Sequence, residues 1–128
     1  MCAAIHSTFQ FLWVGFYRVV DQTLVLGPFQ GPIACTRISA HQGVCGAAWS
    51  ANKPIRVDDV DAFPGHIACS SESRSEIVVP ISVDGQVIAV LDIDSHRLSD
   101  FSQIDEQALA RISALLSDRY PSDRSTES

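Results

Sequence analysis

The sequence predicts a single α+β domain in which helices pack on one face of a central antiparallel sheet. Two observations carry this prediction. Apolar runs over residues 76–83 and 86–93 flank Asp84-Gly85, a dipeptide that is typical of a β-hairpin turn. Residues 99–117 then carry an apolar stripe at helical spacing. The stripe consists of Ile104, Ala108, Ile112, Leu115 and Leu116.

The first part of the chain predicts two strands. Residues 12–20 are rich in aromatic and β-branched residues, and Asp21-Gln22 makes a plausible turn into a second strand over 23–26. Gly27-Pro28 is expected to end that second strand. Residues 31–40 are mixed in character and are expected to form a loop or a short strand.

The middle of the chain predicts a short helix followed by a long loop. Residues 43–51 contain helix formers and stop before a proline, and residues 55–57 fit a short strand. Residues 58–75 are the longest irregular stretch, and long loops in compact domains are often functional. Farther on, Ser102 with Asp105 resembles a capping box at the start of the last helix.

The composition is that of an ordered globular domain. The 128 residues include 46 % hydrophobic and 19 % charged side chains, which is unlike a disordered chain. With a net charge of −6 and only 9 Lys and Arg residues, nucleic acid and anionic membranes are not expected as partners. Because no signal peptide and no apolar run of about 20 residues is visible, we expect a cytoplasmic protein. In that reducing compartment, paired thiols are more often catalytic or redox-sensing than structural.

Three of the four cysteines, Cys35, Cys45 and Cys69, lie near the middle of the chain in distinctive local sequences. Thiols placed in this way suggest attack on an oxidised substrate followed by closure of a disulfide. None of their intervals is that of a C-x2-C metal clip, so we expect no metal site. Cys2, close to the terminus, is expected to take no part.

Cys69 is the candidate nucleophile. Its flanks are polar and turn-prone, and His66 and Arg74 could favour its thiolate, although a buried inert cysteine is the alternative. Cys35 and Cys45 are the candidate resolving partners. Cys45 is expected at a helix N-terminus, where the dipole lowers a thiol pKa, or else as a small residue that packs beside alanines.

Glu76, Asp92 and Asp94 form a candidate acidic set. Asp92 and Asp94 have the same parity in an apolar strand and therefore point to one face, although Asp94 could simply reach solvent at the strand end. A two-residue loop at Asp84-Gly85 would turn Glu76 to the other face. A three-residue loop that also includes Val83 would place Glu76 opposite Asp92. We predict the three-residue loop, and hence at least one carboxyl that holds a proton near neutral pH.

Trp13 and Tyr17 share one strand face with Gly15. Most aromatic stripes of this kind belong to a core. The alternative is the wall of a ligand pocket, in which Gly15 leaves room between the two rings.

Together these segments resemble the free methionine-R-sulfoxide reductases, a small enzyme family built on the GAF fold. The resemblance spans roughly residues 13–116. The matching segments are 13–17, 26–31, 34–38, 43–46, 62–69, 73–80 and 90–95. A generic GAF domain shares the hydrophobic pattern but lacks three cysteines in these settings, so the motifs are specific.

The resemblance implies a thiol mechanism. Cys69 would attack the sulfur of free L-methionine (R)-sulfoxide and become a sulfenic acid as methionine leaves. Cys35 would then close a disulfide with Cys69, with Cys45 as an alternative or relay. Thioredoxin would reduce that disulfide by exchange.

The resemblance also implies roles for the other candidate residues. Glu76, Asp92 and Asp94 would hold the substrate and protonate its oxygen. Trp13 and Tyr17 would enclose its methyl group. The family further implies a cytosolic homodimer that needs no metal or organic cofactor.

The chain departs from the family at its start. Family members usually carry an N-terminal helix that packs beside the C-terminal helix and often forms the dimer face, whereas twelve residues precede Trp13 here. We therefore expect a short N-terminal segment over 1–11, a GAF-like catalytic domain over 12–118 and a polar tail over 119–128. The apolar stripe of the last helix would then be partly uncovered.

Three rival functions remain open. Many GAF domains bind a small ligand as sensors without turning it over. A redox switch would join Cys35 and Cys69 in response to peroxide at least as readily as to methionine sulfoxide. A zinc site could combine the cysteines with His41 or His66, although the spacing argues against it.

Overall fold

One antiparallel sheet with a helix on each side makes up the described part of the protein. The computed structural model describes residues 13–30, 37–39, 42–63 and 74–119. The strands are β1 (Trp13–Val20), β2 (Thr23–Gln30), β3 (Arg37–Ser39), β4 (Ile55–Val57), β5 (Ser75–Val83) and β6 (Gln86–Ser95), and the helices are α2 (Gly43–Ala51), the 3-10 helix η1 (Val60–Ala62) and α3 (Gln103–Arg119). The strands are arranged in the order β3-β2-β1-β6-β5-β4, and each pair of neighbours is antiparallel.

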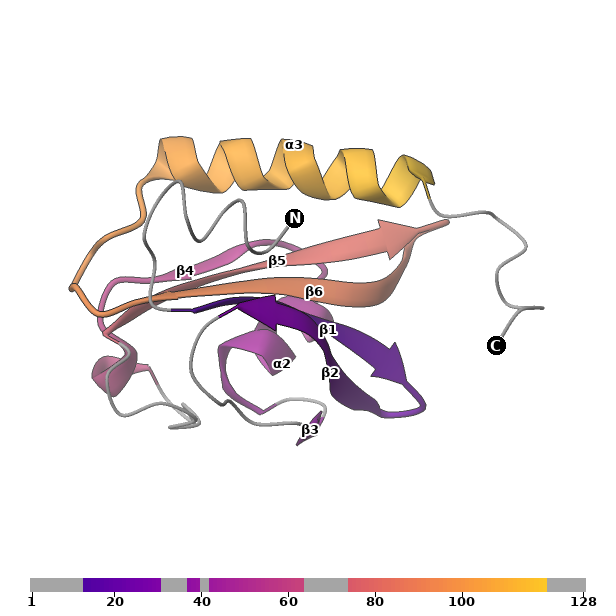
Figure 1. Cartoon of the computed structure of the whole chain (residues 1–128), viewed down its shortest axis with the longest axis horizontal. Coiled ribbons are helices and arrows are strands. Elements are labelled where there is room, and N and C mark those ends of the chain that lie inside the picture. The colour runs from indigo at the N-terminus through magenta and orange to yellow at the C-terminus, as the bar shows by residue number, and fades with distance from the viewer. Residues whose placement is uncertain (1–12, 31–36, 40–41, 64–73, 120–128) are drawn as a thin grey trace.

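The predicted α+β class is confirmed, but α2 and α3 cover opposite faces of the sheet instead of sharing one (Figure 1). Val78 of β5 belongs to the same core cluster as Val44 of α2. Its neighbours Ile77 and Val79 belong to a second cluster with Leu109 of α3. Because successive side chains of a strand point to opposite faces, the central strands supply apolar residues to both sides. Each side therefore needs a cover, and a single-face arrangement would leave one of them in water.

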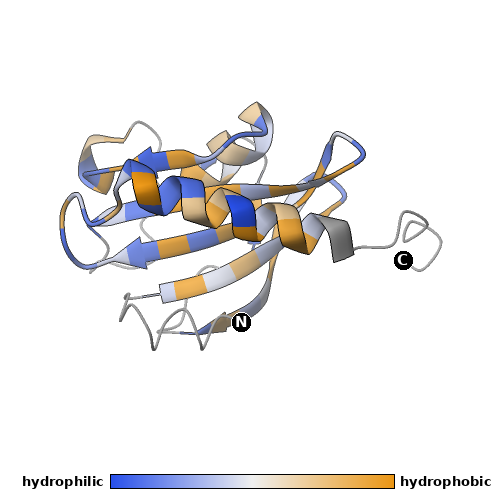
Figure 2. Ribbon diagram, turned by 90° about the horizontal axis from the view of Figure 1, so that it is seen from above, coloured by the Kyte–Doolittle hydropathy of each residue, from blue (hydrophilic) through white to orange (hydrophobic). Residues whose placement is uncertain are grey.

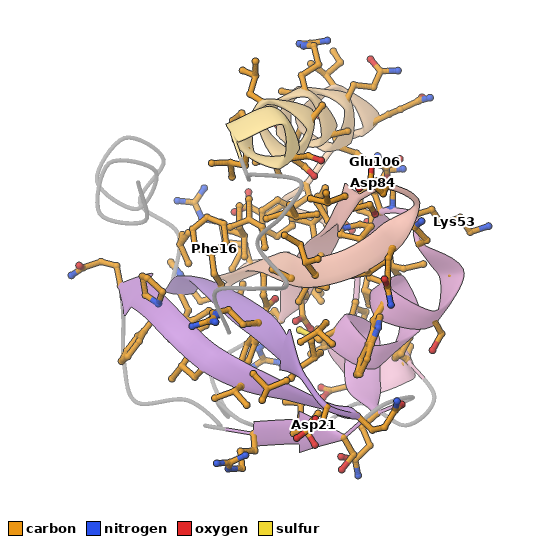
Figure 3. All side chains as sticks on the ribbon, turned by 90° about the vertical axis from the view of Figure 1, so that its right-hand side faces the viewer. Phe16, Asp21, Lys53, Asp84 and Glu106 are labelled. Atoms are coloured by element: carbon orange, nitrogen blue, oxygen red, sulfur yellow. The ribbon has the colours of Figure 1, made fainter. Side chains whose placement is uncertain are left out.

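The β5–β6 hairpin turns on two residues, so the predicted three-residue loop is wrong. Val83 pairs with Gln86 across the turn. Asp84 and Gly85 have φ angles of 54° and 79°, the left-handed values that a tight hairpin turn requires. Figure 3 looks onto the two hairpin turns of the sheet, with Asp84 labelled at one tip and Asp21 at the other. The turn predicted at Asp21-Gln22 is confirmed, because the strands pair on either side of it.

A β-bulge in β6 shifts the register of this hairpin by one residue. Near the turn, Ser82 pairs with Val87. The next pair is Ile81 with Ala89, so Ile88 is an extra residue in β6. Every residue of β6 beyond the bulge therefore points to the opposite face from the one that the turn alone would give it.

β2 continues through Gly27-Pro28, which was expected to end it. The register between β1 and β2 shifts between Gly15 and Tyr17, so that the two residues Gly27 and Pro28 lie opposite the single residue Phe16. Among the described residues, β3 pairs with β2 only as far as Val25. The proline lies beyond that pairing, where its missing N–H interrupts no ladder hydrogen bond to β3.

α3 begins at the predicted capping box. The N–H of Ser102 donates to Oδ2 of Asp105 at 2.8 Å, and the N–H of Asp105 donates to Oγ of Ser102 at 3.1 Å. The predicted apolar stripe is only partly buried: Ala108, Ile112 and Leu116 are half-buried, whereas Ile104 and Leu115 are 74 % and 62 % exposed. Leu109, which was not predicted to belong to the stripe, is 9 % exposed and packs in the core. The strip of α3 that meets the sheet is therefore displaced from the predicted one, and Figure 2 shows hydrophobic and hydrophilic bands following one another along α3. Within the described ranges, no helix is long and apolar enough to cross a membrane.

Hydrogen bonds fix the start of β5 to the segment that follows β6. Oγ of Ser75 donates to the carbonyl of Arg97 at 2.6 Å and accepts from the N–H of Asp100 at 3.3 Å. The N–H of Arg74 donates to the carbonyl of Ser95 at 2.8 Å. Oγ of Ser95 in turn donates to Oδ2 of Asp100 at 2.5 Å. This network anchors the chain immediately before the first of the predicted acidic residues.

Candidate functional site

Three neighbouring strands present the predicted polar residues to the face that α2 covers. Asp94 of β6 pairs with Trp13 of β1 on one side and with Glu76 of β5 on the other. Asp92 pairs with Gly15 of β1. Paired residues of an antiparallel sheet share a face, so the acidic set does come together. Glu76 lies opposite Asp94, not opposite Asp92 as predicted, because the bulge in β6 and not a longer turn sets the register.

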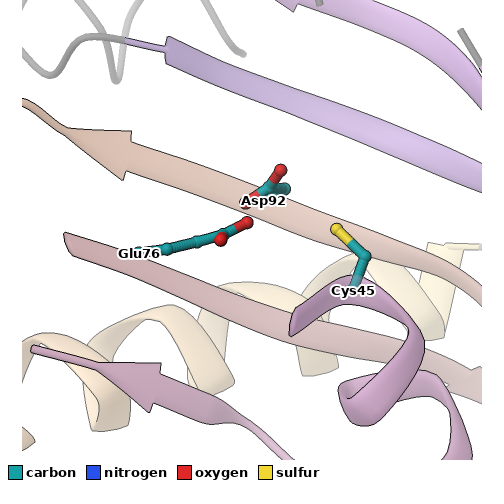
Figure 4. A group of neighbouring side chains, drawn as sticks. All are labelled: Cys45, Glu76 and Asp92. Atoms are coloured by element: carbon teal, nitrogen blue, oxygen red, sulfur yellow. The ribbon is translucent and has the colours of Figure 1, made fainter. Parts of the chain in front are cut away.

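Cys45 of α2 lies against two of these carboxyls. One sulfur or oxygen atom each of Cys45, Glu76 and Asp92 lies within 4.8 Å of the other two. Figure 4 shows the thiol pointing from α2 toward Asp92, with Glu76 reaching toward the same point from β5. The three residues are 3 %, 6 % and 5 % exposed, respectively. Asp94 is half-buried, so the acidic set extends from a partly accessible carboxyl to fully enclosed ones.

Burial and nearby charge raise the pKa of Asp92 and of Cys45. The pKa of Asp92 lies well above its ordinary range, first because burial disfavours the charged form and then because of the charges of Asp94 and Glu76. Burial, followed by the charge of Asp92, likewise raises the pKa of the Cys45 thiol. Asp92 therefore fits the prediction of a carboxyl that holds a proton near neutral pH. The expectation that a helix dipole lowers the pKa of Cys45 is wrong, because desolvation in the core outweighs it.

An aromatic wall lies beside the carboxyls on the same face. The ring centroids of Trp13 and Tyr17 are 5.9 Å apart, and Trp13 also stacks on Phe29 of β2 at 5.7 Å. A Cβ atom at Gly15 would lie 2.2 Å from Cη2 of Trp13, closer than two carbon atoms can approach. Only glycine therefore lets the indole lie over the strand at this point. Trp13 and Tyr17 are buried core residues, and they also border the acidic set.

Two buried polar atoms of this face have no hydrogen-bond partner in the described part of the chain. They are Nε1 of Trp13, which is a donor, and Oδ1 of Asp92, which accepts whenever it is unprotonated. An unmade hydrogen bond in a closed core costs about 1–3 kcal/mol, so folded proteins rarely retain one. A small polar ligand that both accepts and donates hydrogen bonds would satisfy the pair.

The remaining predicted site residues lie outside the described residues. Of the three central cysteines, Cys45 falls within the described ranges, where it is a free thiol. Cys35 and Cys69 do not, and neither do His41 and His66. The predicted nucleophile, the predicted disulfide and the alternative zinc site therefore remain predictions.

Two contacts of the site were not predicted from the sequence. The stacking of Phe29 on Trp13 depends on the register shift in β2, which no turn signal announces. The contact of Cys45 with Asp92 depends on how α2 docks on the sheet. The run of buried small and apolar residues along α2 is the signal that could have placed this thiol on the inner side of the helix.

The cluster of Cys45, Glu76 and Asp92 contains ligand types that bind zinc. A metal ion would require the thiolate form of Cys45, whereas burial and the adjacent carboxyls raise the pKa of this thiol. The arrangement is thus better suited to holding and moving protons than to holding a cation.

Comparisons with known proteins identify the family of this chain. A family model described as GAF domain matches residues 1–118. GAF domain-containing protein A of Dictyostelium discoideum is 56 % identical over 115 residues, which cover 89 % of this chain and 73 % of that protein. The free methionine-R-sulfoxide reductase of Escherichia coli is 54 % identical over 104 residues, which cover 81 % of this chain and 63 % of the reductase.

Solved structures extend the likeness to three dimensions. The X-ray structure of the free methionine-R-sulfoxide reductase from Neisseria meningitidis, in complex with its substrate, matches with a TM-score of 0.93 at 49 % identity. The match covers 98 % of this chain and 76 % of that one. The chain spans less than two thirds of the length of the Escherichia coli reductase, at 63 %. The chain belongs to the GAF domain family, in the group that includes the free methionine-R-sulfoxide reductases.

Proposed function

We propose that the protein reduces free L-methionine (R)-sulfoxide to L-methionine, with protein thiols as the source of electrons. The observation that carries the proposal is the buried face that combines an aromatic wall with carboxyls and with two polar atoms that have no partner among the described residues, Nε1 of Trp13 and Oδ1 of Asp92. Relatives named as free methionine-R-sulfoxide reductases support it, including one solved in complex with its substrate.

The chemistry of the substrate fits this face. Free methionine sulfoxide carries an ammonium group, a short apolar methyl and a sulfoxide oxygen that must gain a proton as it is transferred. Glu76, Asp92 and Asp94 supply negative charge for the ammonium and a proton for the oxygen. Trp13 and Tyr17 supply an apolar wall for the methyl group.

The reaction then proceeds through three thiol steps. The thiolate of Cys69 attacks the sulfoxide sulfur, the oxygen passes to Cys69, and methionine leaves with two more electrons than it brought. The thiol of Cys35 attacks the resulting sulfenic acid, water leaves and a disulfide forms, with Cys45 as the alternative partner. The dithiol of thioredoxin reduces this disulfide and is itself oxidised. We place this cycle in the reducing cytoplasm and in a homodimer.

The test is NADPH consumption with thioredoxin, thioredoxin reductase and free methionine (R)-sulfoxide. We expect turnover that is lost in Cys69→Ser and retained in Cys2→Ser, the matched control outside the proposed site. The (S) epimer should give no turnover, and a methionine sulfoxide within a peptide should give far less than the free amino acid. Sedimentation of the same protein measures the expected dimer.

Three outcomes would replace the proposal. Saturable binding of methionine sulfoxide without turnover would indicate a ligand sensor. A disulfide formed with peroxide but not with methionine sulfoxide would indicate a redox switch. Stoichiometric zinc in the purified protein, lost together with the thiol titre, would indicate a metal site.

A further inference from the structure

We infer that Cys45 is a positioning residue: its buried thiol donates a hydrogen bond to Asp92 and holds that carboxyl with Oδ1 left for the substrate. The inference rests on the proposed function, in which Asp92 gives its proton to the sulfoxide oxygen. It assigns Cys45 a role other than disulfide formation.

The contact is built from rigid parts of the fold. Cys45 lies in the first turn of α2, and its flanking residues Val44 and Ala48 are 2 % and 0 % exposed in the core. Its sulfur belongs to the group of ligating atoms within 4.8 Å of one another, and Figure 4 shows it directed at Asp92. A side-chain hydrogen bond between the two groups contributes to the pKa of each, in opposite directions. The thiol therefore cannot leave Asp92 without moving a helix that is packed on the sheet.

The direction of this hydrogen bond follows from the chemistry of the two groups. A thiol carries one weak donor, and a carboxyl keeps an oxygen that can accept it whether or not the other oxygen carries a proton. The bond raises the pKa of Cys45 and lowers that of Asp92, as expected when S–H donates to the carboxyl. The other groups that act on Asp92 are Asp94 on the same strand and Glu76 on β5, and both raise its pKa, as burial does.

The contact with Cys45 therefore lowers the pKa of Asp92, whereas burial, Asp94 and Glu76 raise it. Tyr17 of β1, whose pKa is raised by burial and then by the charge of Asp92, also faces this carboxyl and carries no positive charge. A general acid works best when its pKa lies near the working pH, because a proton held too tightly is transferred slowly. The thiol keeps Asp92 from becoming too weak an acid and fixes its orientation.

The same geometry makes Cys45 a poor nucleophile. The thiolate is the reactive form, and a thiol buried beside carboxyls resists losing its proton. A resolving role would also require the sulfur to leave the core and its contact with Asp92. Cys45 is thus assigned to the acid, and the disulfide is left to Cys35 and Cys69.

The first test is the pH profile of methionine formation in a single turnover, without thioredoxin. The basic limb reports loss of the proton from the acid. In Cys45→Ala the donor is gone, the pKa of Asp92 rises, and this limb should move to higher pH by about one unit. Cys45→Ser retains a donor, and its limb should lie at or below that of the wild type. An unmoved limb in Cys45→Ala, or an intact profile with loss of recycling alone, would overturn the inference.

The second test does not depend on activity. A variant with Cys2→Ser, Cys35→Ser and Cys69→Ser leaves Cys45 as the single thiol of the chain. Its S–H stretching band in the Raman spectrum should lie at the position of a hydrogen-bonded thiol. Asp92→Ala in this background should move the band toward that of a free thiol.

Asp94→Ala, on the same strand and face, is the matched control and should leave the band in place. An S–H band that stays in place in Asp92→Ala would overturn the role of Cys45, whether or not the protein is an active reductase. A band that moves in a protein whose wild type has no reductase activity would contradict the proposed function alone.

Discussion

The two faces of the central strands are made of alternating residues, yet they differ in how far their buried polar groups are hydrogen-bonded. On the α3 face, Leu91 packs in an apolar cluster, and the buried hydroxyl of Ser113 donates to the carbonyl of Pro80 at 2.6 Å. On the α2 face, one residue farther along β6, Oδ1 of Asp92 and the indole N–H of Trp13 are buried without a hydrogen-bond partner among the described residues. The proposed substrate would supply the partners that this face lacks.

This difference separates the source of stability from the source of function. A fully satisfied apolar face contributes to folding in proportion to the area that it buries. A face that holds unmet donors and carboxyls lowers stability, and natural proteins tolerate this mainly at functional sites. Substitutions on the α2 face should therefore mainly lower activity, whereas substitutions on the α3 face should mainly lower stability. The predictions below test that contrast.

The largest expected effect is on activity. Asp92→Asn should lower kcat/KM for methionine (R)-sulfoxide by about 10²–10⁴-fold, because the amide cannot supply the proton. Its stability to urea should stay equal or rise, since an amide has nearly the same shape and, unlike the carboxyl, needs no added proton to be buried without charge. Asp84→Asn, at the exposed hairpin tip, is the control and should change neither quantity. An Asp92→Asn protein that unfolds easily would place this residue among the structural ones.

The next effect should be on stability alone. Leu91→Ala removes a fully buried side chain from the α3 face and should lower the free energy of unfolding by about 2–5 kcal/mol. The kcat/KM of the protein that remains folded should change by only a few-fold. Urea denaturation and assays well below the melting temperature measure the two quantities. Comparable losses of both would mean that the faces are coupled more tightly than the contrast implies.

A smaller effect is expected at Gly15, where the ring of Trp13 lies over β1. Gly15→Ala forces the indole of Trp13 off the strand, which should lower stability by about 1–3 kcal/mol and weaken substrate binding. Gly27→Ala is the matched control, because its Cβ would meet the nearest atom, the carbonyl oxygen of Phe16, at 3.4 Å. The control should lie within about 0.5 kcal/mol of the wild type. Tryptophan fluorescence with added methionine sulfoxide would report both the displaced ring and the weaker binding.

The gentlest test varies pH. The folded-state pKa of Asp92 is raised, so its contribution to stability is fully present below the unfolded pKa of about 3.9 and is lost as pH rises toward the folded pKa. The stability of Asp92→Asn relative to wild type should therefore increase above about pH 4, by at most ~1.4 kcal/mol per pH unit. Urea titrations at several pH values measure this difference. A constant difference would mean that Asp92 ionises normally in the folded protein.

Much of the fold was predictable because its signals are local. The hairpin dipeptide at Asp84-Gly85 and the capping box at Ser102 each depend on a few neighbouring residues, and both formed where expected. The loop length was wrong because no local pattern reveals the extra residue at Ile88. Ile104 matched the helical period yet is exposed, because period alone does not say which strip of α3 meets the sheet.

Parts of the site were also predictable from local sequence patterns, and parts were not. Strand parity placed Asp92 and Asp94 on one face, and spacing placed Trp13 and Tyr17 together on one face of their own strand. That the rings lie beside the carboxyls follows from the pairing of β1 with β6. The partner of Cys45 could not be foreseen in the same way, because it depends on how a helix docks on a sheet from elsewhere in the chain. Parity is a property of one strand, whereas docking is a property of the assembled fold.

The bulge at Ile88 makes the site depend on the number of residues between the hairpin turn and Asp92. Because of this one extra residue, every side chain of β6 that follows it, Asp92 included, points to the opposite face of the sheet. Removing one residue between the turn and Asp92 would move the carboxyl to the position of Leu91, against α3, and bring Ile93 to the position of Asp92, whereas removing two would preserve the alternation. An exposed hairpin usually tolerates changes in length, but in this protein an odd change would erase the site without altering any of its side chains.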